Sequence, residues 1–138
     1  MKEAQDGVYV DASALVKLVI TETESDALRA FLGDDPKLYS SRIAAVEVRR
    51  AVGRQNERDA GQQLDALLGT VQFVELDKRM ADAAAAARPA SLRSLDAIHL
   101  AAALSISEGL RAVIAYDARL AAALRSAGLD VQTPGQLP

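Results

Sequence analysis

Short, mainly apolar runs alternate with longer stretches of mixed polarity along the whole chain. The short runs predict strands, because a strand buried on both faces is apolar throughout. They fall at residues 8–10, 37–40, 71–76, 112–115 and 129–131. The longer stretches carry apolar residues at helical spacing and predict helices. They fall at residues 12–20, 22–32, 42–55, 59–68, 78–87, 94–107 and 117–127. Strands that alternate with helices indicate a parallel sheet covered by helices on both faces.

Glycine and proline mark the ends of these elements. Gly33, Gly69 and Gly128 follow predicted helices, and Pro89 disfavours helix in the residue before it. The chain has no internal repeat and no linker long enough to divide it. We therefore expect residues 1–138 to form one α/β domain, a three-layer α/β/α sandwich around a parallel sheet of four to five strands.

The composition is that of a globular domain with an aliphatic core. Half of the residues are hydrophobic and 25% are charged, which excludes a disordered chain. Aromatic residues make up 4% and tryptophan is absent, so aliphatic side chains must fill the core. Alanine is the most abundant residue, and it favours helices because it loses no side-chain entropy on entering one.

The chemistry that the chain can perform is limited by its lack of cysteine. Without cysteine there is no disulfide, thiolate metal site or cysteine nucleophile, and the single histidine, His99, excludes an ordinary zinc site. Carboxylates remain, and these hard oxygen ligands suit Mg²⁺ or Mn²⁺. The formal net charge of −3 argues against bulk attraction to nucleic acid. A local patch of basic residues, or bound metal ions, would still make the electrostatic potential positive at the binding site itself.

The sequence shows no targeting or membrane-spanning segment. The first ten residues carry acidic side chains, unlike the cationic start of a signal peptide, and the early apolar stretch is too short to cross a bilayer. We expect a soluble, cytoplasmic protein with no membrane partner.

Two aspartates follow predicted strands. Asp11 ends the first strand and Asp117 follows the strand at 112–115. In open parallel sheets, sites form beyond the carboxyl ends of the strands, at the point where the strand order reverses. Each aspartate also precedes a helix, so capping of that helix is an alternative role.

Two further acids lie on predicted helices. Asp96 is in the first turn of a helix that is apolar nearly all round and therefore buried, so its charge needs a partner or a metal ion. Compensation of the helix dipole is the simpler alternative. Glu47 borders the apolar stripe of its helix, where a pair with Arg50 is the alternative to a functional role.

Four arginines and the histidine have open interpretations. Arg50, Arg54 and Arg58 follow one another at helical spacing and could track a phosphate backbone, or form a solvated face. Arg93 is a candidate phosphate contact or an ordinary surface residue. For His99, a hydrogen-bonded core position competes with a role as general acid or RNA contact.

Four segments resemble the motifs of PIN-domain ribonucleases. The first is YVDASAL at residues 9–15, and the second is SRIAAVEVRRA at 41–51, which contains Glu47. The third, LRSLDAIHLAAAL at 92–104, is the most specific match, and AYDARL at 115–120 resembles the fourth. The resemblance covers almost the whole chain, and the short single-domain form resembles the VapC toxin branch of this family.

The resemblance implies a metal-dependent endoribonuclease. It assigns the catalytic, metal-binding positions to Asp11, Glu47, Asp96 and Asp117, with Mg²⁺ or Mn²⁺ as the cofactor. Asp11 and Asp96 are expected to bind the metal directly, and Glu47 and Asp117 directly or through water. A metal-activated water would attack the phosphorus in line and leave a 5′-phosphate and a 3′-hydroxyl. Close carboxylates repel by about 4 kcal/mol per pair at 4 Å, and bound cations remove that cost.

One position departs from the pattern. Family members often carry a hydroxyl residue two positions before the fourth acid, where this chain has Ala115. Ser13 keeps a hydroxyl near Asp11 and is expected to support a carboxylate or a metal-bound water.

The resemblance also implies partners. They are an RNA substrate, a cognate antitoxin that wraps the domain and blocks the acids, and a second copy of the chain in a homodimer. An apolar set of residues could line the antitoxin groove or belong to the core, which is the commoner role of helical stripes. The set comprises Ala14, Leu15, Leu18, Val19, Leu28, Phe31 and Leu32.

Other α/β classes match less well. A response-regulator receiver needs adjacent acids after the first strand, and here Val10 precedes Asp11. A haloacid-dehalogenase-type phosphatase needs an aspartate where this chain has Ser13. The remaining alternative is a PIN fold that binds RNA or a partner without catalysis.

Overall fold

The computed structural model describes residues 5–55 and 58–137, which form one sheet with helices on both faces. All pairings between neighbouring strands are parallel, in the order β3-β2-β1-β4-β5. The strands are β1 (Gly7–Val10), β2 (Lys37–Ser41), β3 (Val71–Val74), β4 (Leu110–Ile114) and β5 (Val131–Gln132). The predicted parallel sheet is therefore confirmed.

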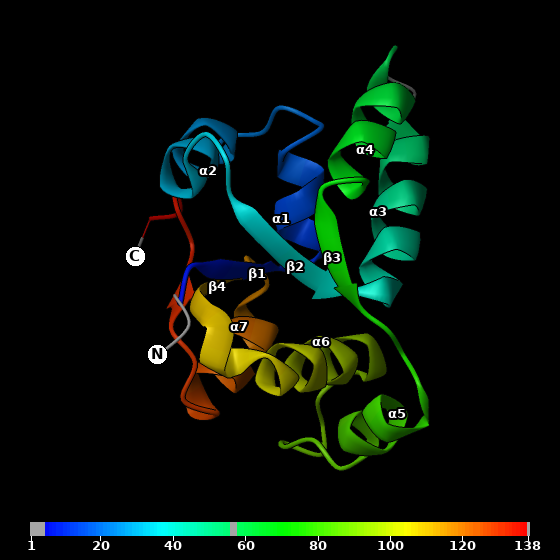
Figure 1. The fold of residues 1–138 in the computed structure, drawn as a ribbon, viewed down its shortest axis with the longest axis vertical. Coiled ribbons are helices and arrows are strands. Elements are labelled where there is room, and N and C mark those ends of the chain that lie inside the picture. The colour runs from blue at the N-terminus through cyan, green and yellow to red at the C-terminus, as the bar shows by residue number, and fades with distance from the viewer. Residues whose placement is uncertain (1–4, 56–57, 138) are drawn as a thin grey trace.

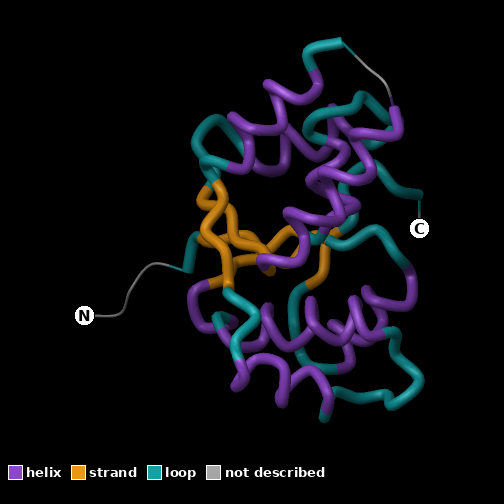
Figure 2. Tube along the Cα trace, turned by 90° about the vertical axis from the view of Figure 1, so that its right-hand side faces the viewer, coloured by secondary structure: helices purple, strands orange, loops and turns teal. Residues whose placement is uncertain are grey.

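The helices form two layers around this sheet. They are α1 (Ala12–Lys17), α2 (Ser25–Leu32), α3 (Arg42–Gln55), α4 (Ala60–Leu68), α5 (Lys78–Ala85), α6 (Ser94–Ser105) and α7 (Ala118–Ser126), with a short 3₁₀ turn at Ser107–Gly109. Helices α1 to α4 lie on one side of the strands and α5 to α7 on the other (Figure 1). The view turned by 90° shows the strands between two groups of helices (Figure 2), which confirms the three-layer architecture.

The central strand explains why the layers form. Val8 and Val10 belong to the core beneath α1 to α4, whereas Tyr9 between them belongs to the core beneath α6 and α7. Successive side chains of a strand point to opposite faces, so an apolar β1 needs cover on both sides. The sequence of β1 thus requires the sandwich in which it lies.

Two element boundaries differ from the prediction for identifiable reasons. Helix α2 begins at Ser25 rather than at residue 22, because the Ser25 hydroxyl accepts the N–H of Glu22 and donates to the carbonyl of Lys17. Such side-chain bonds to the backbone compete with helix formation. Strand β4 begins at Leu110, earlier than predicted, because Leu110 pairs with Gly7 of β1.

The apolar set offered as an antitoxin groove belongs to the core. Ala14, Leu15 and Leu28 are fully buried, and Val19 and Leu32 nearly so, while Leu18 and Phe31 pack against them. The core interpretation is confirmed for the five buried residues, whereas Leu18 and Phe31 are partly exposed at the edge of this core.

In the described part of the chain, every helix is too short or too polar to cross a membrane.

Candidate active site

The order of the strands creates a crevice at the carboxyl end of β1. The chain runs from β1 outward to β2 and β3, and then returns to the other side of β1 as β4. The loops that leave β1 and β4 therefore diverge, which is where parallel sheets place their sites. The Asp11 N–H donates to the carbonyl of Ile114 at 3.1 Å and joins the two strand ends.

Asp11 is a buried carboxylate held by its own helix. Its Oδ1 accepts the Ser13 hydroxyl at 2.6 Å and the Ala14 N–H at 3.0 Å, so it does cap α1. The residue is 4% exposed. Burial raises the pKa of Asp11, against the opposing effect of the Ser13 hydrogen bond and the nearby His99. A nearby cation would favour the ionised form of this carboxyl.

Ser13 connects the two sides of the crevice. Besides donating to Asp11, its hydroxyl oxygen accepts the N–H of Tyr116 at 3.2 Å, from the loop that follows β4. The chain has no hydroxyl at Ala115, but the Ser13 hydroxyl bonds to the backbone of the next residue, Tyr116.

Asp117 is the most exposed of the four acids. Its Oδ1 accepts the N–H groups of Arg119 and Leu120, both at 3.0 Å, and so caps α7. The predicted capping role is confirmed. The charge of Asp117 still acts across the crevice, because it raises the pKa of Asp96.

Asp96 lies in the first turn of α6 and is partly buried. Burial is the largest cause of its raised pKa, followed by the charge of Asp117 and, more weakly, that of Glu47, while His99 and Arg93 oppose the shift. Acids from α3, α6 and the loop after β4 therefore act on one another although they are far apart in sequence.

Glu47 is attached to the histidine rather than to Arg50. Its Oε1 lies 2.8 Å from Nε2 of His99, whose Nδ1 lies 2.7 Å from the hydroxyl of Tyr9. His99 is 2% exposed, so the prediction of a hydrogen-bonded core histidine is confirmed. The link to Glu47 was not predicted from the sequence. Its only local signal is the position of His99 three residues after Asp96, on the same side of α6.

The donors of the site suit a hydrated divalent cation. They are carboxylate and hydroxyl oxygens, as Mg²⁺ and Mn²⁺ prefer. Within residues 5–55 and 58–137, no group of three or more His, Cys, Asp or Glu side chains is arranged to hold a metal ion. Mg²⁺ does not require such a cage, because it is usually bound through one or two carboxylates and keeps several waters. Asp11 and Asp96 each carry a carboxylate whose raised pKa a nearby cation would oppose.

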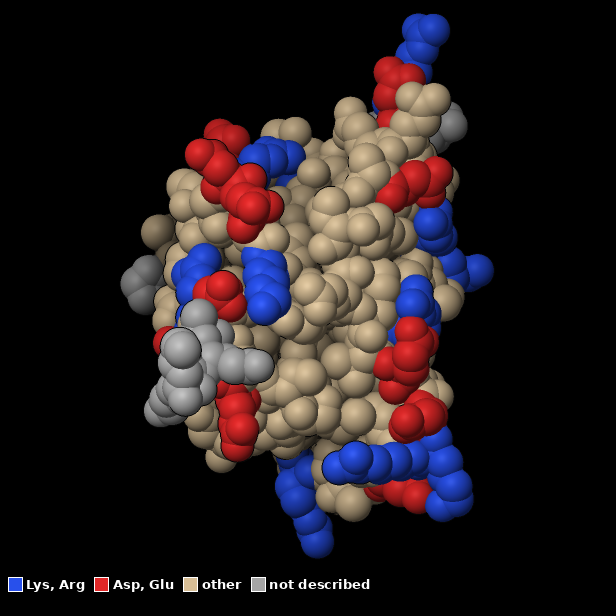
Figure 3. Space-filling view, in the orientation of Figure 1, with Lys and Arg blue, Asp and Glu red and all other residues tan. Residues whose placement is uncertain are grey.

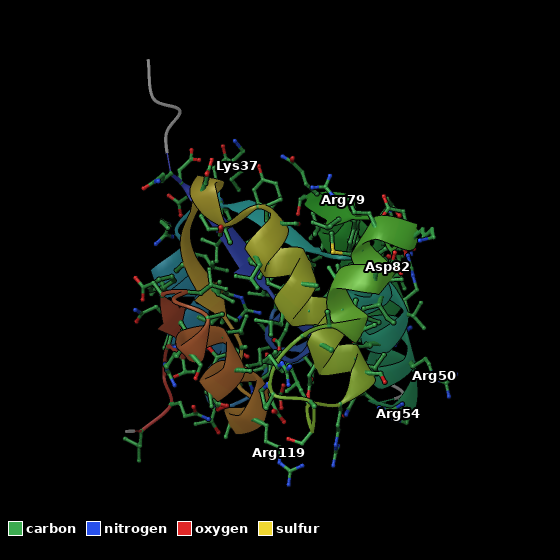
Figure 4. All side chains as sticks on the ribbon, turned by 90° about the horizontal axis from the view of Figure 1, so that it is seen from below. Lys37, Arg50, Arg54, Arg79, Asp82 and Arg119 are labelled. Atoms are coloured by element: carbon green, nitrogen blue, oxygen red, sulfur yellow. The ribbon has the colours of Figure 1, made fainter. Side chains whose placement is uncertain are left out.

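A cavity of about 470 Å³ lies beside Glu47. Ser13, Glu47, Arg50 and Arg54 are among its lining residues. Helix α3 continues past Gly53, so both arginines follow Glu47 on one helix, and Figure 4 shows them at the side of the molecule away from Lys37.

Two other predicted arginines lie apart from this cavity. Arg58 occupies a turn beyond the end of α3, so the predicted stripe ends at Arg54. Arg93 is exposed at the N-cap of α6, where its charge lowers the pKa of Asp96. A larger cavity, about 820 Å³, opens between α5, α6 and α7 and contains none of the predicted site residues.

Comparisons with known proteins agree with this fold. The family model of the PIN domain matches residues 8–124. Ribonuclease VapC46 of Mycobacterium tuberculosis is 40% identical over 129 residues, which are 92% of this chain and 97% of that protein. Ribonuclease VapC47 of the same species is 37% identical over 132 residues, 93% of this chain and 97% of that protein.

Solved structures show the same architecture. A toxin–antitoxin complex from Klebsiella pneumoniae contains a chain with a TM-score of 0.73 at 21% identity, covering 95% of this chain and 100% of that chain. Mycobacterium tuberculosis VapC20, described as a toxin that cleaves the sarcin–ricin loop, has a TM-score of 0.69 at 16% identity, covering 93% and 100%.

These matches define the class first: the sheet order, the helical layers and the family model are those of a PIN domain. Within that class, the chain belongs to the VapC ribonuclease family, because its full-length relatives at up to 40% identity are VapC ribonucleases.

Proposed function

We propose that this protein is the toxin of a toxin–antitoxin pair and hydrolyses RNA phosphodiester bonds with Mg²⁺ or Mn²⁺. The observation that carries the proposal is the match to VapC ribonucleases over nearly the whole chain, and the acids Asp96, Asp117 and Glu47, close enough for their charges to raise the pKa of Asp96, support it. A module that only binds RNA would gain nothing from concentrating negative charge at the crevice where a phosphate must approach. Because the substrate is RNA, we expect the protein to act in the cytoplasm.

Each acid has a distinct role in this proposal. Asp11 and Asp96 hold the cation directly, since they are the carboxyls whose burial a cation would offset. Ser13 orients Asp11 through its short hydrogen bond. Asp117, whose Oδ1 is engaged in capping α7, contributes through Oδ2 or through water.

The chain itself supplies the base. When bound, a divalent cation would lower the pKa of a water and offset the charge on the leaving oxygen. Glu47 has Oε1 engaged with His99, so Oε2 is available to hold the attacking water and to take its proton.

Local arginines, rather than overall charge, would bring the RNA to the acids. The net charge is −3, and Figure 3 shows basic and acidic side chains interspersed around the rim of one face. Arg50 and Arg54 line the cavity that contains Glu47, and we propose that they contact the phosphates of a single strand entering it. Arg93, at the entrance of α6, is the candidate contact on the other side of Asp96.

A nuclease assay with Asp96→Asn tests the proposal. Wild-type protein should cleave single-stranded RNA with Mg²⁺ or Mn²⁺, lose the activity in EDTA and regain it when the metal is restored. D96N should lose at least about 100-fold in rate, because it removes a carboxylate from the cation. The matched control is D82N, the same change on the exposed face of α5, where Asp82 pairs with Lys78. Full activity of D96N, or activity in EDTA, would overturn the proposal.

The antitoxin is proposed to cover the same cavity. Val46 is 57% exposed and Leu95 is 44% exposed, and both line this cavity beside Glu47. An amphipathic antitoxin segment would bury this apolar rim and exclude RNA. We also expect a homodimer. Copurification with the product of a neighbouring small gene, and sedimentation of the isolated chain, test the two expectations. Binding that Val46→Asp leaves unchanged would exclude this cavity as the antitoxin site.

A further inference from the structure

The one histidine of the chain joins three elements that surround the crevice. Its ring lies on α6, and its two nitrogens meet the hydroxyl of Tyr9 on β1 at 2.7 Å and Oε1 of Glu47 on α3 at 2.8 Å. The rings of Tyr9 and His99 meet edge to face, with their centroids 5.9 Å apart. Both ring nitrogens are thus within hydrogen-bond distance of a partner, and the two rings pack edge to face.

The chemistry of the partners determines the direction of both hydrogen bonds. An ionised carboxylate only accepts, so Nε2 of His99 must carry a hydrogen and donate it to Glu47. In the neutral imidazole Nδ1 is then bare and accepts the Tyr9 hydroxyl, whereas an imidazolium would donate to that oxygen. Tyr9 is fully buried, and burial raises its pKa, so it keeps the proton that it donates. The chain of donors runs from Tyr9 through His99 to Glu47.

Glu47 needs such an anchor. It lies on the outward edge of α3, next to Val46, which is mostly exposed. A free glutamate side chain samples many rotamers, and holding it in one of them costs conformational entropy. The buried ring, itself held by Tyr9, reaches out of the core and fixes one oxygen of a carboxylate whose other oxygen stays available.

We propose that His99 is a positioning residue that acts through Glu47: as the neutral Nε2–H tautomer fixed by Tyr9, it holds Oε1 so that Oε2 faces the cavity. The kinetic consequence rests on the proposed ribonuclease activity, whereas the tautomer and the tether do not.

The first test reads the tautomer directly by NMR of metal-free protein labelled with ¹⁵N. Because the chain has one histidine, its imidazole signals need no assignment. We expect a protonated Nε2 and a bare Nδ1 near neutral pH. In Tyr9→Phe, which removes the donor to Nδ1, we expect the ¹⁵N resonance of Nδ1 to move because that nitrogen loses its hydrogen bond, while Nε2 keeps the hydrogen that Glu47 accepts. A protonated Nδ1 in the wild type, or a ring unaffected by Y9F, would overturn the proposed tether.

The second test separates positioning from packing by kinetics. His99→Leu keeps the apolar bulk and removes the donor, and it should lower kcat about 10- to 100-fold with KM little changed, as losses of supporting residues do. His99→Gln keeps an amide N–H able to reach Glu47 and should recover most of the loss. In a Glu47→Gln background, H99L should cost no more than about twofold further, because the two residues act as a unit.

Leu100→Ala is the matched packing control on the same helix. Leu100 is buried and lies outside the site, so L100A should lower the melting temperature and leave kcat unchanged below it. A loss in H99L that Gln does not restore, or that persists in full with E47Q, would reduce His99 to a packing residue.

The failures of this inference and of the proposed function are distinguishable. A wild type without RNase activity overturns the function, and the NMR measurement still decides the tether. A fully active H99L beside an inactive D96N overturns the role of His99 and leaves the ribonuclease standing.

Discussion

At the scale of single residues, the central feature is a pair of carboxyls whose ionisation the fold disfavours. Burial is the largest cause of the raised pKa of both Asp11 and Asp96. Neighbouring acids add to the shift, from Glu47 on Asp11 and from Asp117 on Asp96. Without a cation, the folded state therefore favours the protonated form of these two carboxyls, whereas the proposed chemistry needs the ionised form. The stability of the fold consequently depends on both pH and metal binding.

This coupling predicts how the stability of the metal-free protein depends on pH. Both carboxyls have folded-state pKa values above the ordinary value of 3.8, so above that value the folded state binds more protons than the unfolded state. The stabilisation that the two carboxyls give the folded state is fully present below pH 3.8 and is lost as the pH rises through their folded-state pKa values. The unfolding free energy of the wild type, measured by urea titration at successive pH values, should fall across this window relative to D11N/D96N.

Saturating Mg²⁺ should reverse the loss in the wild type and have no such effect on the double variant, because the ion binds the ionised carboxylates of the folded state. Parallel pH profiles for the wild type and D11N/D96N would contradict this assignment.

The sequence identified the acids but not what holds them. Asp11 and Asp117 follow apolar strands, and Asp96 begins a buried helix, so local pattern marked them as candidates, and the resemblance to PIN domains selected them. The partners of Glu47 and Ser13 are His99 and Tyr116, which are 52 and 103 residues away in sequence. The periodicity of a single helix or strand cannot predict such contacts, because they form only when α3, α6 and the strand ends are packed together.

At the scale of elements, α3 combines chemistry and binding on one helix. Glu47 and the two arginines Arg50 and Arg54 line one cavity, whereas Arg49 forms an ion pair with Asp65 of α4. Helical spacing, which put the arginines in line with Glu47 in the sequence, is thus realised in the structure. The predicted extension to Arg58 is not, because α3 ends at Gln55.

This arrangement predicts a difference between arginines of the same helix. R50A/R54A should raise KM for RNA, leave kcat nearly unchanged and lower the salt dependence of binding by about 0.7 per lost phosphate contact on a single strand. R49A is the control on the same helix: it removes one positive charge from an exposed ion pair and should change neither KM nor the salt dependence. Binding isotherms at several salt concentrations measure this, and equal effects of the two variants would contradict the proposed path of the RNA.

Elements were predicted more reliably than their ends. Alternating strand and helix patterns gave the layers and the parallel sheet, because β1 and β4 are too apolar to be left uncovered. Ends depended on individual hydrogen bonds, such as those of the Ser25 hydroxyl that delay α2. These bonds join a side chain to backbone atoms, and the types of residues along the chain do not tell which backbone atoms will be within reach.

At the scale of the whole molecule, one sheet separates two cores that share β1. Leu28 is fully buried in the first core and Leu124 in the second. Val8 and Val10 pack in one core and Tyr9 in the other. Disruption of either core should therefore unfold the whole sheet in one step.

The shared strand predicts that L28A and L124A each lower the unfolding free energy by about 2–5 kcal/mol while unfolding stays a single transition. Leu104→Ala is the control, since this residue is 41% exposed and its truncation should cost little. Calorimetry and circular dichroism should give coincident transitions for all three variants. Two separable transitions in either core variant would show that the layers fold independently.

The most direct measurement of the central claim is a crystal structure of the protein with Mn²⁺, located by its anomalous scattering. The account predicts a peak between Asp11 and Asp96, with carboxylate oxygens of both residues coordinated directly to the ion. A peak bound by other residues, or no peak between these two aspartates at millimolar Mn²⁺, would contradict it.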